Sequence, residues 1–253
     1  MPVPAKAFQR WLQGIAPDTS TADICRVSGI KRTTLAQQLV RGKVAETTVV
    51  AISRAYGLNP VAALAGFDAY RSLAGPPQPP THGELVSQVS TPDLLRAVLA
   101  RTAETTAENT AQAAGPHGSA GPPSLTPAPH ATSVRNWVDA IDDGELRHRV
   151  SAATGVAPQN FSAQLTANRL SPELAVATSL AAGVGPAGGL VATGLVTEAE
   201  AGWPPDARQA AVDAMSDGDL TALAGERLQA LGKVLRRQEH DTAQTEQIWE
   251  NLG

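Results

Sequence analysis

The sequence contains few of the residues on which several protein classes depend. It has one cysteine, Cys25, which excludes a disulfide framework and any zinc site built from cysteines. Aromatic residues make up only 4% of the chain, so we expect small cores built from helices and aliphatic side chains. No apolar run approaches the roughly 20 residues that span a bilayer, and the N-terminal residues lack the apolar core of a signal peptide. We therefore expect a cytoplasmic protein with no membrane partner.

No arrangement of residues typical of an enzyme is present either. The five histidines are scattered, and none is spaced from a carboxylate or thiol as metal ligands are. The Gly-rich run at 185–194 does not follow a strand, so it does not match a phosphate-binding loop. We expect no enzymatic activity, no cofactor and no bound metal.

The chain is an internal duplication. Trp11 and Trp137 lie 126 positions apart, and an ungapped alignment at this offset continues through both halves. Further identical pairs are Gly29/Gly155, Gln38/Gln164, Leu39/Leu165, Pro60/Pro186, Leu64/Leu190, Ser90/Ser216, Asp93/Asp219, Leu94/Leu220 and Arg101/Arg227. Because Trp, Gly and Pro seldom coincide by chance in one frame, we infer two copies of one module.

Breaks in composition divide the chain further. Residues 114–132 are rich in Gly, Pro and Ser without hydrophobic periodicity, which predicts a flexible linker. We expect modules at 1–73 and 133–200, followed by helical extensions at 74–113 and 201–253.

The first module begins with two expected helices. Apolar residues recur at helical spacing in the first of them, at Phe8, Trp11, Leu12 and Ile15. Ser20 or Thr21 can cap a second helix, and Gly29 lies in a tight turn that favours positive φ.

Three more helices are expected in this module. A third spans about Arg32 to Val40, a fourth about Glu46 to Tyr56, and Pro60 begins a short fifth. The second and third helices, joined by a short Gly-containing turn, form a helix-turn-helix motif, whose second helix can enter the major groove of DNA.

The segments SGIKRTTLAQQLVRG (28–42) and AISRAYGLNPVAALAGF (51–67) resemble the lambda-repressor-like (Cro/repressor type) helix-turn-helix domain. They resemble especially the immunity repressors of actinobacteria and their phages. The resemblance covers about residues 5–70 and 133–198. It implies an all-α fold with two tandem five-helix domains. Outside the resemblance, we expect each domain to be followed by an additional helix, and the two domains to be joined by the flexible linker.

Charge distinguishes the two copies. Residues 1–75 contain nine basic and four acidic side chains, a net charge of +5. Residues 131–200 contain four basic and seven acidic side chains, a net charge of −3. Since neutralisation of phosphates supplies most non-specific affinity for DNA, the first copy is the better candidate to bind it.

The resemblance assigns base contacts to the start of the third helix, at Lys31, Arg32, Thr33 and Gln37. Arg can bind guanine through two atoms, Gln can pair with adenine, and a Thr methyl group can contact thymine. Contacts to phosphates are expected from Thr21, Thr34, Arg41 and Lys43. The alternative is a solvated helix face that is merely basic.

The second copy lacks the two cations at the corresponding helix start, where it has Ala157 and Pro158. Gln159 and Asn160 can still contact bases, and Arg169 can contact a phosphate. The acidic segment DAIDDGE (139–145) would repel DNA. Two interpretations remain open: a second, weaker DNA reader, or a domain that docks a protein or dimerises.

A stripe of apolar residues follows the C-terminal extension at helical spacing, at Leu220, Leu223, Leu228, Leu231, Val234 and Leu235. It can pack on its own module or on a second chain, which leaves self-association through this helix open. Covalent linkage of two copies could instead replace the second subunit, so that a monomer reads double-stranded DNA.

These observations favour a sequence-specific DNA-binding transcriptional regulator of the phage or prophage repressor type. The alternative is a protein-interaction regulator, such as an antirepressor or an antitoxin-like adaptor, in which the second copy docks a protein.

Overall fold

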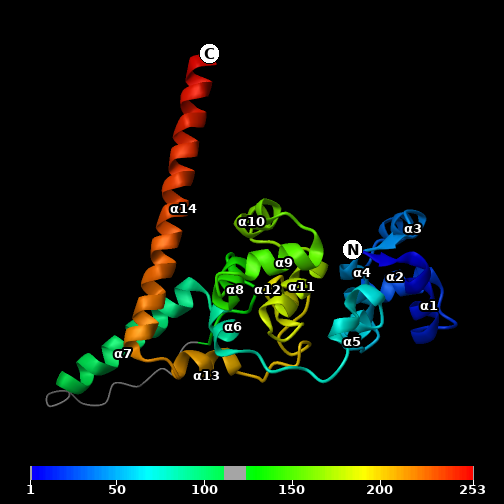
Figure 1. Ribbon diagram of the computed structural model, residues 1–253, viewed down its shortest axis with the longest axis horizontal. Coiled ribbons are helices and arrows are strands. Elements are labelled where there is room, and N and C mark those ends of the chain that lie inside the picture. The colour runs from blue at the N-terminus through cyan, green and yellow to red at the C-terminus, as the bar shows by residue number, and fades with distance from the viewer. Residues whose placement is uncertain (1, 111–123, 253) are drawn as a thin grey trace. The chain divides into compact units, whose positions relative to one another are not determined.

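The computed structural model describes residues 2–110 and 124–252, and over these residues the chain is largely helical (Figure 1). The strands found there, β1 (Val3–Pro4) and β2 (Lys43–Val44), have two residues each and pair antiparallel. The expected all-α class is therefore confirmed. Within the same residues, no helix combines the length and the hydropathy needed to cross a bilayer.

The first copy forms five α-helices and a 3-10 helix: α1 (Ala5–Ile15), α2 (Thr21–Ser28), α3 (Arg32–Val40), α4 (Glu46–Ala55), α5 (Pro60–Ala65) and η1 (Asp68–Leu73). Helix α3 has the predicted bounds, and α4 ends one residue before the predicted Tyr56. Ser20 is the residue that caps α2, because its hydroxyl accepts a hydrogen bond from the backbone N–H of Asp23.

The second copy repeats this order with α8 (Ser133–Ile141), α9 (Leu146–Thr154), α10 (Pro158–Thr166), α11 (Pro172–Ala182) and α12 (Gly188–Ala192). Helix α10 begins and ends 126 residues after α3, so the offset found in the sequence also relates these two helices.

Each copy is followed by two helices instead of the single additional helix that we expected. These are α6 (His82–Ser87) and α7 (Thr91–Thr110) after the first copy, and α13 (Ala207–Asp213) and α14 (Asp217–Leu252) after the second. The division has a local cause. Thr81 and Glu84 form a capping box that starts α6, and Ser90 accepts a hydrogen bond from the N–H of Asp93 where α7 begins.

The chain forms two compact units that differ from the two copies. The first unit consists of Met1–Gln88 with Pro127–Ala207, and the second of Val89–Thr126 with Arg208–Gly253. The helices from α1 to α5 and from α8 to α12 thus belong to one unit, while α7 and α14 belong to the other.

Part of the segment that we assigned to the linker makes defined contacts. The backbone N–H of Thr126 donates to Asp93 over 3.0 Å, and the N–H of His130 donates to the Ser133 hydroxyl over 2.7 Å. The remainder of the assigned linker at 114–123 lies outside the described residues.

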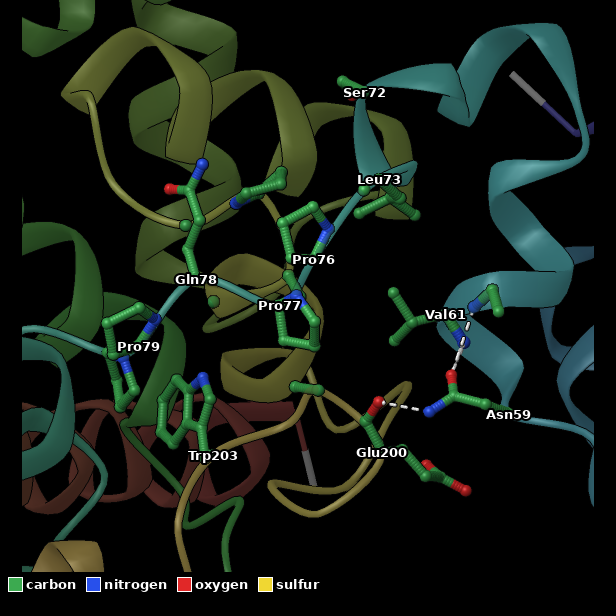
Figure 2. A pocket seen from close by; sticks show the side chains of 18 of the residues that line it. Asn59, Val61, Ser72, Leu73, Pro76, Pro77, Gln78, Pro79, Glu200 and Trp203 are labelled. Atoms are coloured by element: carbon green, nitrogen blue, oxygen red, sulfur yellow. Dashed lines mark hydrogen bonds between the residues drawn. The ribbon is translucent and has the colours of Figure 1, made fainter.

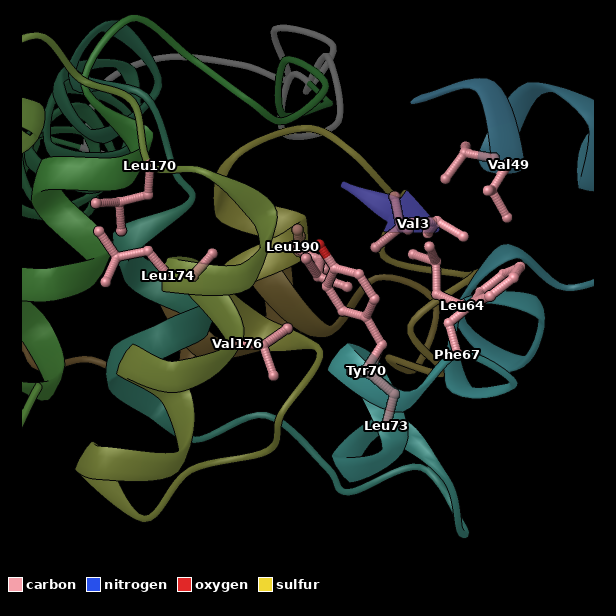
Figure 3. Close-up of a cluster of buried hydrophobic side chains, with 14 of the residues drawn as sticks. Val3, Val49, Leu64, Phe67, Tyr70, Leu73, Leu170, Leu174, Val176 and Leu190 are labelled. Carbon is pink, nitrogen blue, oxygen red and sulfur yellow. The ribbon is translucent and has the colours of Figure 1, made fainter. Parts of the chain in front are cut away.

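The core of the first unit draws on both copies. Figure 3 shows part of it, with Leu64 and Tyr70 from the first copy and Leu174 and Leu190 from the second. Leu64 and Leu190, which align in the repeat, are both completely buried. The Tyr70 hydroxyl donates a 2.5 Å hydrogen bond to Glu46, and burial together with this carboxylate raises the pKa of Tyr70.

The two repeated tryptophans have different surroundings. Trp137 is completely buried, whereas Trp11 is only half-buried against Phe8 and Phe67. Helix α6 from the first copy packs on α8, and the indole N–H of Trp137 donates to the buried carboxylate of Glu84 over 3.2 Å. The tail of one copy thereby completes the core of the other.

An ion pair also joins the two copies within the first unit. The guanidinium of Arg54 binds the carboxylate of Glu200 through two hydrogen bonds of 2.6 and 2.7 Å, and Asn59 donates to the Glu200 carbonyl. Hydrogen bonding to Arg54 lowers the pKa of Glu200. Beside this contact lies a cavity of about 430 Å³, lined by residues that include Pro77 and Trp203 (Figure 2).

In the second unit α7 packs on the first turns of α14. Leu94 and Leu220, which occupy equivalent positions in the repeat, are both completely buried there. Arg101 of α7 donates hydrogen bonds to the carbonyls of Val212 and Met215, just before α14. The equivalent tails of the two copies therefore pack against each other.

The environment of Asp93 leads us to expect that acid lowers the stability of the second unit. Burial alone would raise the pKa of Asp93, but hydrogen bonds from Thr126 and Ser90 outweigh it, so the pKa is lowered. A lowered pKa means that the stabilisation is present above the unfolded pKa of about 3.9 and is lost as pH falls through the folded value. In thermal melts we expect Asp93→Asn to be less stable than the parent at pH 6. The difference in melting temperature between Asp93→Asn and the parent should be smaller at pH 3. A difference that does not change with pH would contradict a stabilising role for the ionised Asp93.

Candidate nucleic-acid interface

Helices α2 and α3 are joined by a short turn that fixes the direction of α3. Gly29 ends α2 with φ of 71°, a left-handed conformation that side chains with a Cβ resist. Lys31 is then extended and precedes the first residue of α3. Leu35 is completely buried and anchors α3 to the core. One face of α3 is thus fixed inward, and its other residues are left at the surface.

The four residues predicted to contact bases all lie on the exposed side of this element. Lys31, Arg32, Thr33 and Gln37 are each exposed. They occupy the residue before α3, its first two positions and one position a turn later. The structure therefore presents two cations, a hydroxyl and an amide along the start of one helix.

The residues predicted to contact phosphates are also exposed: Thr21, Thr34, Arg41 and Lys43. Thr21 is the first residue of α2, and Arg41 and Lys43 follow α3 directly.

Gln38 positions this surface, a role that the sequence analysis missed. Its side-chain oxygen accepts hydrogen bonds from the Thr48 hydroxyl over 2.9 Å and from the Ala45 N–H over 3.3 Å. The end of α3 is thereby attached to α4. The identity of Gln38 and Gln164 in the repeat was the available signal for its importance.

Another basic residue near α3, Arg26, forms an ion pair within its own helix. Arg26 of α2 pairs with Asp23 at 2.9 Å. Hydrogen bonds from Ser20 and then Arg26 lower the pKa of Asp23. Arg26 thus carries a charge already balanced locally.

In the second copy, Gln159, Asn160 and Arg169 are exposed, as are Ala157 and Ala163. A different contact fixes the end of α10 here. The Asn168 side chain, in a residue with φ of 48°, accepts hydrogen bonds from the N–H groups of Val134 and Arg135. The predicted polar residues therefore lie on the surface of α10 without the cations of α3.

The acidic segment of the second copy is paired with neighbouring arginines. Asp143 binds Arg149 at 2.9 Å, and Asp142 lies 3.9 Å from Arg147. Hydrogen bonding to Arg149 lowers the pKa of Asp143. These pairs reduce the repulsion that we expected between this segment and phosphate, and they also occupy the positive charge of both arginines.

Among the described residues, no three His, Cys, Asp or Glu side chains are grouped as metal ligands. The chain matches none of the family models, curated proteins or solved structures with which it was compared.

Proposed function

We propose that the protein is a sequence-specific DNA-binding transcriptional regulator of the repressor type, with two tandem helix-turn-helix domains. In this proposal α3 enters the major groove. The observation that carries it is the exposure of Lys31, Arg32, Thr33 and Gln37 at the start of a helix whose Leu35 is completely buried.

The chemistry of these side chains suits direct reading of bases. Arg32 can donate two hydrogen bonds to guanine, Gln37 can pair with adenine, and the Thr33 methyl group can contact thymine. Arg41 and Lys43, directly after α3, are placed to bind phosphates and fix the register of the helix.

For the second domain we propose weaker reading by α10, with Gln159 and Asn160 at bases and Arg169 at a phosphate. The pairing of Asp142 and Asp143 with arginines supports this role, because it lowers the local repulsion. Protein docking by α10 is the second candidate. The exposed Ala157 and Ala163 favour it, since small apolar side chains allow close approach of another protein.

The test is a selection of binding sites from random double-stranded DNA, followed by gel-shift titrations over a range of salt concentrations. Arg32→Ala should weaken binding to the selected site by about 5- to 150-fold and relax the preference at one position. Arg41→Ala should weaken binding to all sequences alike and reduce the slope of log K against log salt by about 1.

Arg71→Ala provides the matched control, because Arg71 is exposed, lies outside α3 and pairs with Asp68. It should leave affinity for the selected site unchanged. Gln159→Ala and Arg169→Ala test the second domain in the same assay. Absence of DNA binding at low salt would overturn the proposal, and unchanged binding in both second-domain variants would favour protein docking by α10.

A further inference from the structure

The distal part of α14 has an apolar stripe that the described chain leaves exposed. Leu220 and Ala224 are buried against α7, but Leu228, Leu231 and Leu235 are 42%, 45% and 47% exposed, and Val234 is also 47% exposed. Figure 1 shows α14 continuing well past the turns that pack on α7. Helix α14 has 36 residues and α7 has 20.

The spacing of this stripe is that of a helix-pairing seam. From Ala224 the positions advance by four, three and four residues to Leu228, Leu231 and Leu235, which is the spacing of successive a and d positions in a heptad. The exposed seam continues directly from the contact between α7 and α14. The surface is therefore an extension of an existing helix–helix interface.

Two glycines beside the seam are unexplained by the packing of the chain itself. Gly225 and Gly232 lie seven residues apart inside a helix, where glycine is unfavourable relative to alanine. A Cβ at Gly225 would meet nothing within 4 Å, and one at Gly232 would meet only the end of the Arg236 side chain at 3.8 Å. A second helix that approaches closely along the seam would account for both glycines, because a residue without a Cβ lets another helix come near.

We propose that the distal part of α14 pairs with the same segment of a second copy of the chain in antiparallel orientation. Under a two-fold axis, Leu231 of each copy packs against Leu235 of the other, so the seam is complementary to itself. The pairing does not depend on DNA binding.

Charge favours the antiparallel orientation. Three cations, Lys233, Arg236 and Arg237, are followed by two acids, Glu239 and Asp241. In the heptad above, Glu239 and Asp241 flank the seam while the three cations fall on the outer face, so parallel pairing would bring the acids of the two copies to the same level, side by side. Antiparallel pairing instead carries Glu239 and Asp241 of one copy to the start of the other copy's seam, away from their equivalents.

The first test measures the mass of the full chain by sedimentation equilibrium from about 1 to about 200 µM, since a short seam predicts a weak dimer governed by mass action. We expect the mass to rise from one chain to two. The variant with Leu231→Glu and Leu235→Glu should dissociate at least about tenfold more readily, by placing charge in the seam. Leu180→Glu, a matched change at a leucine 50% exposed on α11, should not.

A second variant separates loss of pairing from loss of folding. Gly232→Gln should raise the helicity of the isolated chain, because glutamine is the better helix former, and weaken the dimer by filling the close approach. A single chain at every concentration, a mass above two chains, or equal effects of the Leu231/Leu235 and Leu180 changes would overturn the proposal.

Orientation is tested by oxidative cross-linking, which the buried Cys25 leaves undisturbed. A mixture of Leu231→Cys and Leu235→Cys chains should cross-link to each other. Cross-linking of Leu231→Cys chains only among themselves would show parallel pairing and overturn the antiparallel arrangement.

Discussion

Replacing Trp137 with alanine is expected to destabilise the first unit by about 3–5 kcal/mol, as truncation of a fully buried tryptophan does. The change removes the largest completely buried side chain among the described residues, and the Glu84 carboxylate loses the hydrogen bond that it accepts from the indole N–H. Urea denaturation followed by far-ultraviolet circular dichroism measures this loss.

The duplication supplies a matched control at Trp11. Its ring is half-buried and contacts Phe8 and Phe67 with centroid distances of 5.7 and 5.9 Å. We expect Trp11→Ala to cost only about 1–2 kcal/mol, from partial burial and two aromatic contacts. Equal losses in the free energy of unfolding for Trp11→Ala and Trp137→Ala would contradict our assignment, in which α6 buries Trp137 and has no equivalent contact with Trp11.

Gly188→Ala is the second change with a large expected effect. A Cβ at this position would lie 2.1 Å from the Glu84 Oε1 atom, the same oxygen that accepts from Trp137. Either the carboxylate moves and the buried hydrogen bond is lost, or α12 shifts. We expect a loss of about 2–4 kcal/mol in the free energy of unfolding.

A double-mutant cycle with Glu84→Ala tests the cause. If the clash is with Glu84, the loss from Gly188→Ala should be much smaller in the Glu84→Ala background than in the parent. Gly14→Ala is the control, because a Cβ there would meet nothing within 4 Å, and it should leave stability equal or slightly raised. Additive losses in the cycle would show that the clash lies elsewhere.

Much of each copy could be predicted from local signals. The bounds of α3 could be predicted from the tight turn at Gly29 before the helix and from Gly42 after it, since these signals act over a few residues. The exposure of Arg32 and Gln37 followed as well, because they lie away from the apolar positions of the same helix.

The contacts between copies could not be predicted in this way. Arg54 and Glu200 are 146 residues apart, and Trp137 is 53 residues from its partner Glu84. Aligning the repeat compares equivalent positions of the two copies, so it contains no information about how one copy packs on the other. The sequence from Thr81 to Glu84 did contain the capping-box pattern, and that pattern was the available sign that α6 exists.

The point at which α14 stops packing on α7 could not be predicted from the spacing of its apolar residues alone. Leu220 and Leu231 look alike in the sequence, yet one is completely buried and the other is 45% exposed. The difference depends on which turns of α14 lie against α7, which is a property of packing between distant segments.

The placement of α6 on α8 also sets an order of events during synthesis. Glu84 leaves the ribosome 53 residues before Trp137, whereas Thr81, which donates two hydrogen bonds to the same carboxylate, lies only three residues away from it. The residues of α6 are therefore made before α8, the helix on which they pack. A break in the chain between the two copies would leave the contact of α6 with Trp137 to be made between two separate fragments.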